Sequence, residues 1–378
     1  MKFSSVVGHT KLKERLIRNV NSARISHAQL FVGPQGSGAL PIALAYIQYL
    51  GCTNKQTNDS CGECNSCKKH QKNIHPDVHF VFPVNKNEIH DDKPKSDDFM
   101  PEWRTFLANN PYQNLFDWMS FNEISQKVGL IGVEEANEII KKLSLRAYEA
   151  DYKIMIIWMP EKMHNSAANK ILKILEEPEG KTLFIMVAEN ADELLPTIIS
   201  RTQLIVVQKY ADEDIENALV NQHEINNTKA KEIAYISNGN LNFALQQIAF
   251  EENDFSNLNF YKVWMRNCYV QKIKELMSWV EEIASIGRER QKNFLQYVMQ
   301  NIRNNFALTI GANTTVKLSE DENEFAQKFH QFIHTKNTNK IFDDLNKAFT
   351  DIDRNVNAKM VFLDLSLKIC GHLRIPNS

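Results

Sequence analysis

The 378-residue sequence lacks any apolar run that approaches the ~18 residues of a membrane-spanning helix. Its opening residues, MKFSSVVGHTKLKERL, also lack the apolar core of a signal peptide. An excess of either charge is missing too, because 44 lysines and arginines stand against 46 acidic residues, which gives no general attraction for nucleic acid. We therefore expect a cytoplasmic protein with no membrane contact, whose contacts with DNA come from a local patch or through partners.

Cysteine is scarce and unevenly distributed. Four of the six cysteines form one cluster with the spacing C-x8-C-x2-C-x2-C: Cys52, Cys61, Cys64 and Cys67. A reducing compartment argues against disulfides, and four thiolates with no open position are typical of a structural zinc site. We expect one zinc ion per chain here. The alternatives are a redox role or an iron–sulfur cluster, and the nearby His70 and His75 could compete as ligands.

The first 208 residues alternate short apolar stretches with helical patterns. Strands are expected at 29–32, 78–82, 154–159, 183–188 and 204–207. They lack clean period-two alternation, as strands covered on both faces do. A helix is expected over 165–180, capped by Asn165 or Ser166 and stopped by Pro178 with Gly180. This alternation predicts an α/β domain with a mostly parallel sheet and helices on both faces.

The strands stop near residue 209, and the rest of the chain reads as helix. We expect a small all-α domain at 209–252 and a larger all-α domain at 253–378, with a polar break near 311–324.

An insertion around 85–129 interrupts the α/β rhythm. Residues 85–98 are polar and charged, and we expect them to be mobile. Residues 99–121 are rich in aromatics and in breaks at or near proline. They are expected to pack on the surface as a decoration rather than to form a sheet strand.

A glycine-rich stretch, FVGPQGSGAL, is almost a phosphate-binding loop. Gly33, Gly36 and Gly38 keep the frame between a strand and an apolar helix, the context that such a loop requires. Ala39 and Leu40 occupy the places of the lysine and the hydroxyl that handle phosphate and magnesium. Backbone N–H groups at the helix start can still hold an anion, so nucleotide binding is doubtful but stays open.

Other parts of an ATPase site are also missing. Trp158 and Met159 follow the strand IMII, where acids would hold the metal, and Glu161 lies two residues further along. Asn242 stands where a nucleotide-sensing arginine could project. By contrast, Ser200 and Arg201 lie just before the last strand. Such an arginine is usually surface charge, but its planar guanidinium also suits a phosphoryl group on a neighbouring subunit.

Several stretches of residues 1–250 match one family. They are VVGHTKLKERL, SHAQLFVGPQGSG, the four-cysteine module after the next helix, HPDVHFV, NKILKILEEPEGKTLFIMVAEN and ISRT. Together they resemble an AAA+ clamp-loader subunit, most of all the delta prime subunits of bacterial DNA polymerase III. ISRT resembles the family's Ser-Arg-Cys motif, with Thr202 in place of the cysteine. Residues 253–378 carry no motif that matches.

The resemblance implies a C-shaped subunit with an AAA+ domain, an all-α lid and an all-α collar. It implies a stator in a five-subunit ring that hydrolyses no ATP of its own. Arg201, supported by Ser200, would act as an arginine finger on the nucleotide of an adjacent tau or gamma subunit. The delta subunit, the sliding clamp and primer–template DNA would be further partners. The joint loss of lysine, hydroxyl, acids and sensor arginine fits this division of labour.

Two other functions stay open at this point. One is an active clamp-loader ATPase, against which Ala39 counts heavily. The other is a zinc-dependent DNA-binding protein, which the acidic balance and the lack of a Lys/Arg stripe around the cysteines disfavour.

Overall fold

The computed structural model describes residues 1–87, 89–90, 93–122, 124, 128–251, 257–312, 318, 320–354 and 356–376. The chain divides into two compact units, Met1–Ile225 with Ser237–Asn242, and Asn226–Ile236 with Phe243–Ser378. The predicted boundary at 252/253 lies outside the described residues, as do residues 313–317 and 319 of the polar break near 311–324. The division into three domains stays a prediction.

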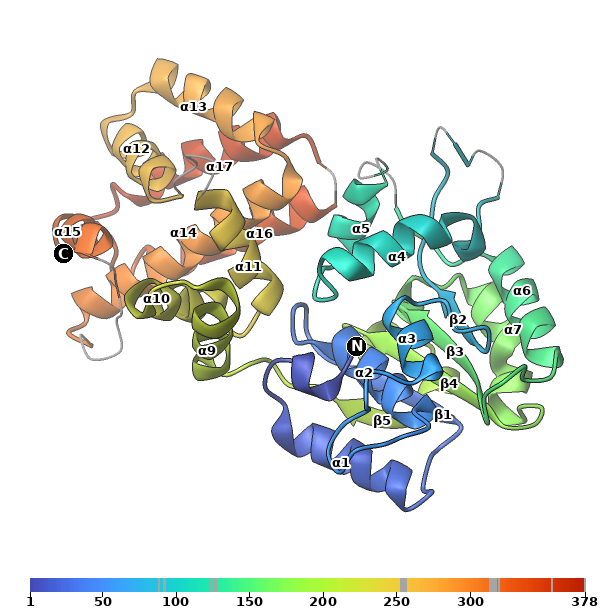
Figure 1. Ribbon diagram of the computed structural model, residues 1–378. Coiled ribbons are helices and arrows are strands. Elements are labelled where there is room, and N and C mark those ends of the chain that lie inside the picture. The colour runs from blue at the N-terminus through green and yellow to red at the C-terminus, as the bar shows by residue number, and fades with distance from the viewer. Residues whose placement is uncertain are drawn as a thin grey trace. The chain divides into compact units, whose positions relative to one another are not determined.

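The first unit is built on a parallel sheet with strand order β2-β3-β4-β1-β5 (Figure 1). The strands are β1 (Ala28–Val32), β2 (Val78–Val81), β3 (Lys153–Trp158), β4 (Thr182–Ala188) and β5 (Gln203–Val206). Each lies within one residue of its predicted range, so the α/β class is confirmed.

Helices cover both faces of this sheet. The helices of this unit are α1 (Thr10–Asn21), α2 (Ala39–Gly51), α3 (Asn65–Gln71), α4 (Met100–Asn109), α5 (Leu115–Phe121), α6 (Val133–Ser144), α7 (Asn165–Glu176), α8 (Pro196–Ile199) and α9 (Asp212–His223). Alternate residues of β3 pack in opposite directions: Ile154 and Ile156 join the core that contains α2, whereas Met155 and Ile157 join the core that contains α6 and α7. A strand buried on both faces needs no polar residue, which explains the missing alternation.

The edge strand β5 differs from this expectation. Leu204 is 49% exposed and Val206 is 56% exposed, whereas every residue of β3 and β4 is buried. An edge strand has a neighbour on one side only, here β1. The sequence pattern of β5 therefore predicted more burial of its side chains than the structure shows.

The start of α7 also differs in detail. The predicted cap was Asn165 or Ser166, but the N-cap is His164, whose ring accepts a hydrogen bond from the Ser166 N–H. The helix ends at Glu176, before Pro178, which cannot continue it.

The aromatic part of the insertion is not a surface decoration. Most of residues 100–121 lie in α4 and α5, which are adjacent helices in Figure 1. Trp103 and Trp118 are fully buried in the core of the first unit, with ring centroids 5.2 Å apart. Parts of the rest, residues 88, 91, 92, 123 and 125–127, lie outside the described residues.

The second unit is all-helical over its described residues, as predicted. Its helices are α10 (Asn227–Ser237), α11 (Leu241–Glu251), α12 (Asn257–Val270), α13 (Ile273–Ser285), α14 (Arg288–Thr309), α15 (Glu320–Phe329), α16 (Thr338–Asp353) and α17 (Ala358–His372). Its separate core includes Trp264 stacked on Trp279, with centroids 4.9 Å apart. In the part of the chain that the structure describes, no helix is both long and apolar enough to cross a membrane.

Candidate functional site

The glycine-rich stretch forms the turn between β1 and α2. Gly33 follows the end of β1, and Gly38 is the N-cap of α2. Gly36 and Gly38 have φ of 70° and 82°, a left-handed conformation that favours glycine. Ala39 and Leu40 begin the helix and are buried. The glycine-rich stretch therefore forms the strand–turn–helix that the sequence predicted, with left-handed glycines in the turn.

Side chains from other segments of the first unit pack so closely against this turn that only glycine fits at these positions. A Cβ added to Gly36 would lie 1.8 Å from the Asn240 side-chain oxygen, and one added to Gly38 would lie 2.1 Å from the Tyr210 hydroxyl. The Leu241 N–H donates to the Gly36 carbonyl at 3.1 Å. The chain itself thus lies against the loop, and the glycines are needed for that contact whether or not a phosphate binds.

The ends of β3 and β4 close the loop from one side. Trp158 is 4% exposed, and Met159 adopts a left-handed conformation with φ of 57°. The Glu161 carboxylate accepts a hydrogen bond from the Glu189 N–H at 2.8 Å, and burial raises the pKa of Glu161. The indole of Trp158 therefore borders the loop, and one oxygen of the Glu161 carboxylate is used by the backbone of Glu189.

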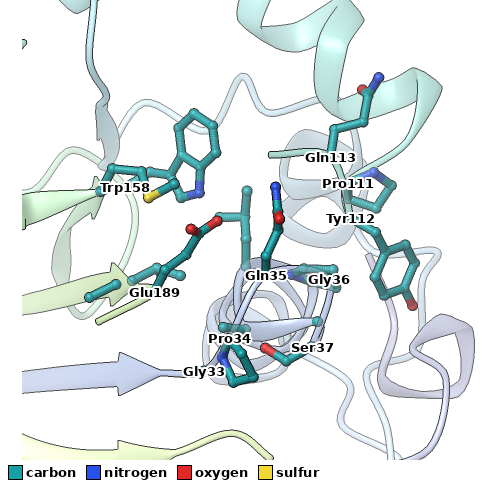
Figure 2. A pocket seen from close by; sticks show the side chains of 17 residues that line it. Gly33, Pro34, Gln35, Gly36, Ser37, Pro111, Tyr112, Gln113, Trp158 and Glu189 are labelled. Atoms are coloured by element: carbon teal, nitrogen blue, oxygen red, sulfur yellow. The ribbon is translucent and has the colours of Figure 1, made fainter. Parts of the chain in front are cut away.

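The insertion closes the loop from the other side. Figure 2 shows Trp158 and Glu189 on one side of the loop and the segment Pro111–Gln113 on the other, with the Gln35 side chain extending between them. The cavity that remains is about 30 Å³. Pockets for drug-sized ligands are ~300–1,000 Å³, and a buried water needs ~10–15 Å³. The space left beside the loop is therefore about a tenth of the lower end of that range.

Asn242 contacts the insertion. Its side-chain oxygen accepts from the Asn110 amide at 3.2 Å, and its nitrogen donates to the Asp117 carboxylate at 2.8 Å. Both polar groups of the residue at the sensor position are therefore used inside the first unit.

Arg201 lies between α8 and β5. Its guanidinium donates to Glu176 through Nε and pairs with it through Nη2, both at 2.9 Å, and Nη1 donates to the Thr197 carbonyl at 3.1 Å. The Ser200 hydroxyl lies 3.5 Å from Nη1. The arginine side chain is 32% exposed, so a group outside the chain can reach it.

Arg201 and the glycine-rich loop lie at opposite ends of the parallel strands. The loop follows the carboxyl end of β1, whereas Arg201 precedes the amino end of β5, which is parallel to β1. Four residues of strand span roughly 13 Å at ~3.3 Å each. Arg201 therefore cannot reach the chain's own loop.

The four clustered cysteines come together in space as their spacing predicts. Their sulfur atoms lie within 4.8 Å of one another, with Cys52 and Cys61 at 3.6 Å and Cys61 and Cys67 at 3.9 Å. A tetrahedral ion with ~2.3 Å bonds to sulfur requires sulfurs ~3.8 Å apart. Backbone N–H groups of Cys61 and Cys64 point to the sulfurs of Cys52 and Cys61. The cluster can hold a metal ion.

The two nearby histidines lie outside this cluster. The His70 ring packs against the His75 ring in a tilted arrangement with centroids 4.6 Å apart, and burial lowers the pKa of His70 to about 3. Among the described residues, only the four cysteines form a group able to hold a metal.

Sequence reasoning missed the residues that close the site from outside the motif. Asn110, Tyr112 and Asp117 belong to the insertion, and Tyr210 and Asn240 lie far along the chain. Their roles depend on contacts between distant segments, and the sequence carried no signal for them beyond the break at Asn110–Pro111.

Known proteins with similar sequences are replication proteins. The family model described as DNA polymerase III, delta subunit matches residues 8–211, more than half of the chain. DNA polymerase III subunit delta' of Bacillus subtilis is 27% identical over 212 residues, which are 56% of this chain and 51% of that protein. The delta' subunit of Escherichia coli is 26% identical over 191 residues, 50% of this chain and 45% of that protein. The chain spans about half the length of the curated relatives that it matches.

Solved structures add little to this. A gamma subunit-related protein of DNA polymerase III from Thermotoga maritima aligns over 96% of this chain and all of its own, with a TM-score of 0.46 and 15% identity. The assignment rests on the sequence matches, which agree with the resemblance found in the motifs. The chain belongs to the DNA polymerase III, delta subunit family, and its relatives there include the delta prime subunits of clamp loaders.

Proposed function

We propose that this chain is a stator of a DNA polymerase III clamp loader. It neither binds nor hydrolyses ATP, and it offers Arg201 to the nucleotide of a neighbouring subunit. In this role it helps to open the sliding clamp and load it on primed DNA in the cytoplasm. The observation that carries the proposal is the closed phosphate loop, where about 30 Å³ remains between Trp158 and the segment Pro111–Gln113.

The position of Arg201 supports action on another subunit. It lies at the end of the strands opposite to its own loop, and the exposed β5 residues Leu204 and Val206 follow it. Its ion pair with Glu176 is partly exposed, and such pairs contribute only ~0.2–1 kcal/mol. Leaving Glu176 for a neighbour's phosphate would therefore cost little. Ser200 and the Thr197 carbonyl would keep the guanidinium oriented.

The partners follow from the family. Relatives include the gamma subunit of Buchnera aphidicola and the tau subunit of Bacillus subtilis, at 23% and 24% identity. We propose a tau or gamma subunit as the neighbour that receives Arg201, with a delta subunit, the clamp and primer–template DNA engaged through the complex. Residues 253–378 would serve as the collar through which the subunits assemble, and residues 209–252 as the lid.

The metal in the four-cysteine cluster is proposed to be zinc. The sulfur separations near 3.8 Å fit a tetrahedral ion, and four thiolates leave no position for a substrate. Zinc would act here as a structural ion that fixes residues 52–67.

The test of the nucleotide claim uses the isolated chain. Hydrolysis of radiolabelled ATP should stay at background, because the loop lacks the lysine, the hydroxyl and the metal-binding acids. Turnover above background would establish the active-ATPase alternative instead. Mixing with tau or gamma and delta partners should then yield a defined complex that loads a clamp.

A further inference from the structure

We propose that the segment Asn110–Asp117 packs on the phosphate-loop site in place of an external ligand. It occupies the side of the loop that faces the insertion, and it fixes the Ser237–Asn242 turn against the loop without a nucleotide. This gives the insertion a role that holds whether or not Arg201 acts on a neighbour.

Both ends of the segment are anchored in the core. On α4, Trp103 is fully buried and packs 5.1 Å from Trp158, measured between ring centroids. On α5, Trp118 is fully buried and its indole N–H donates to the Pro83 carbonyl at 2.8 Å. Buried aromatic side chains contribute strongly to stability and prefer a defined geometry. The segment between the two helices is therefore held in place from both sides.

Tyr112 joins the segment to the N-terminal part of the unit. Its hydroxyl accepts a hydrogen bond from the Val7 N–H at 3.1 Å. Its ring lies beside Gly38, where an added Cβ would come within 3.3 Å of it, and its centroid is 6.5 Å from that of Tyr210. One side chain of the insertion thus contacts both the loop and the segment before α1.

Asn242 joins the segment to the Ser237–Asn242 turn. It is 2% exposed, and it accepts from Asn110 while it donates to Asp117. The donor and the acceptor therefore come from opposite ends of the same segment. A buried amide that used neither group would be costly, so these bonds hold the turn at one distance from the insertion.

The Ser237–Asn242 turn also contacts the glycine-rich loop. The Leu241 N–H donates to the Gly36 carbonyl, and the Asn240 side chain covers the position where Gly36 has no Cβ. Loop, turn and inserted segment thus form a closed set of contacts within the first unit. Such a set keeps the loop in one conformation in the absence of any ligand.

The test measures hydrogen–deuterium exchange of the full chain by mass spectrometry. Asn242→Ala should speed exchange in the peptide that contains Leu241 by about tenfold, and Asn110→Ala by about fivefold, because each releases the turn from the segment. Asn109→Ala is the matched control, since Asn109 is exposed and adjacent to Asn110, and it should leave that peptide unchanged.

Asn110 is half-buried, so Asn110→Ala keeps the test open if the buried Asn242→Ala variant fails to fold. Unchanged exchange around Leu241 in Asn110→Ala would overturn the proposal. Saturable binding of a fluorescent ATP analogue by the unaltered chain would overturn it too, because the site would then be free. Failure of Arg201 to act on a neighbour would alter neither result.

Discussion

Asp77 shows how one charged side chain joins two segments of the first unit. It is 4% exposed and accepts hydrogen bonds from the N–H groups of Tyr148, Glu149 and Ala150 at 2.5, 2.8 and 2.8 Å. Burial alone would raise its pKa, but these donors outweigh it, and the pKa of Asp77 lies below its ordinary value. The carboxylate therefore stabilises the fold in its charged form.

We predict that Asp77→Asn lowers the free energy of unfolding by about 2 kcal/mol at pH 7, as expected for bonds to a charged group. Because the folded pKa is lowered, the contribution is present above the unfolded pKa of ~3.9 and is lost as the pH falls through the folded pKa. Denaturant unfolding at pH 7 and below pH 4 should show the difference between the two proteins shrinking. Asp151→Asn, at an exposed neighbour, is the control. A difference that does not change with pH would contradict this account.

Single residues were predictable where their spacing carried the chemistry. The cysteine spacing predicted the cluster, because two C-x-x-C steps bring three sulfurs together locally and Cys52 lies only nine residues before them. The loop glycines were predictable for the same reason. The partners of Asn242 were not, because Asn110 and Asp117 are more than a hundred residues away in sequence.

The four-cysteine module is the element that depends most on a ligand. Elemental analysis should find about one zinc per chain. Removal of the metal by a chelator should speed hydrogen exchange within residues 52–71, because the ion stabilises this loop-rich segment. Cys64→Ser should lose the metal. Cys268→Ser should keep it, since Cys268 lies buried in the second unit. A metal-free protein whose module exchanges no faster would exclude the four-thiolate site.

Elements with strong local signals were predicted well. The strands follow from short apolar runs, and α7 follows from its helical stripe. The insertion was misjudged, because burial of Trp103 and Trp118 depends on Phe82 and Trp158 from other segments. Aromatic content alone does not distinguish a surface element from one that closes a site.

At the scale of the whole molecule, two compact units whose hydrophobic cores are separate predict two unfolding transitions. Trp103→Ala should lower the melting temperature of the first unit only, and Trp264→Ala that of the second unit only. Each substitution should lower the free energy of unfolding of its unit by ~3–5 kcal/mol, because it truncates a fully buried tryptophan. Differential scanning calorimetry of both variants checks this. A single transition that both substitutions shift equally would show that the units unfold together.

The class of each part of the chain was predictable, because strands and helices leave different periodicities. The observed pair of units was not, because residues 226–236 and 237–242 fall in different units although they are adjacent in sequence. That division depends on tertiary contacts, which a linear pattern does not report.

The central claim is that this chain completes a neighbour's ATP chemistry. The most direct measurement is ATP turnover by the reconstituted loader with Arg201→Ala, alongside Arg146→Ala as an exposed arginine control and a size-based check of assembly. We predict that the complex still forms and that turnover at the nucleotide facing Arg201 falls by about 10³-fold or more, whereas Arg146→Ala has no effect. An intact complex with unchanged turnover in Arg201→Ala would contradict the account.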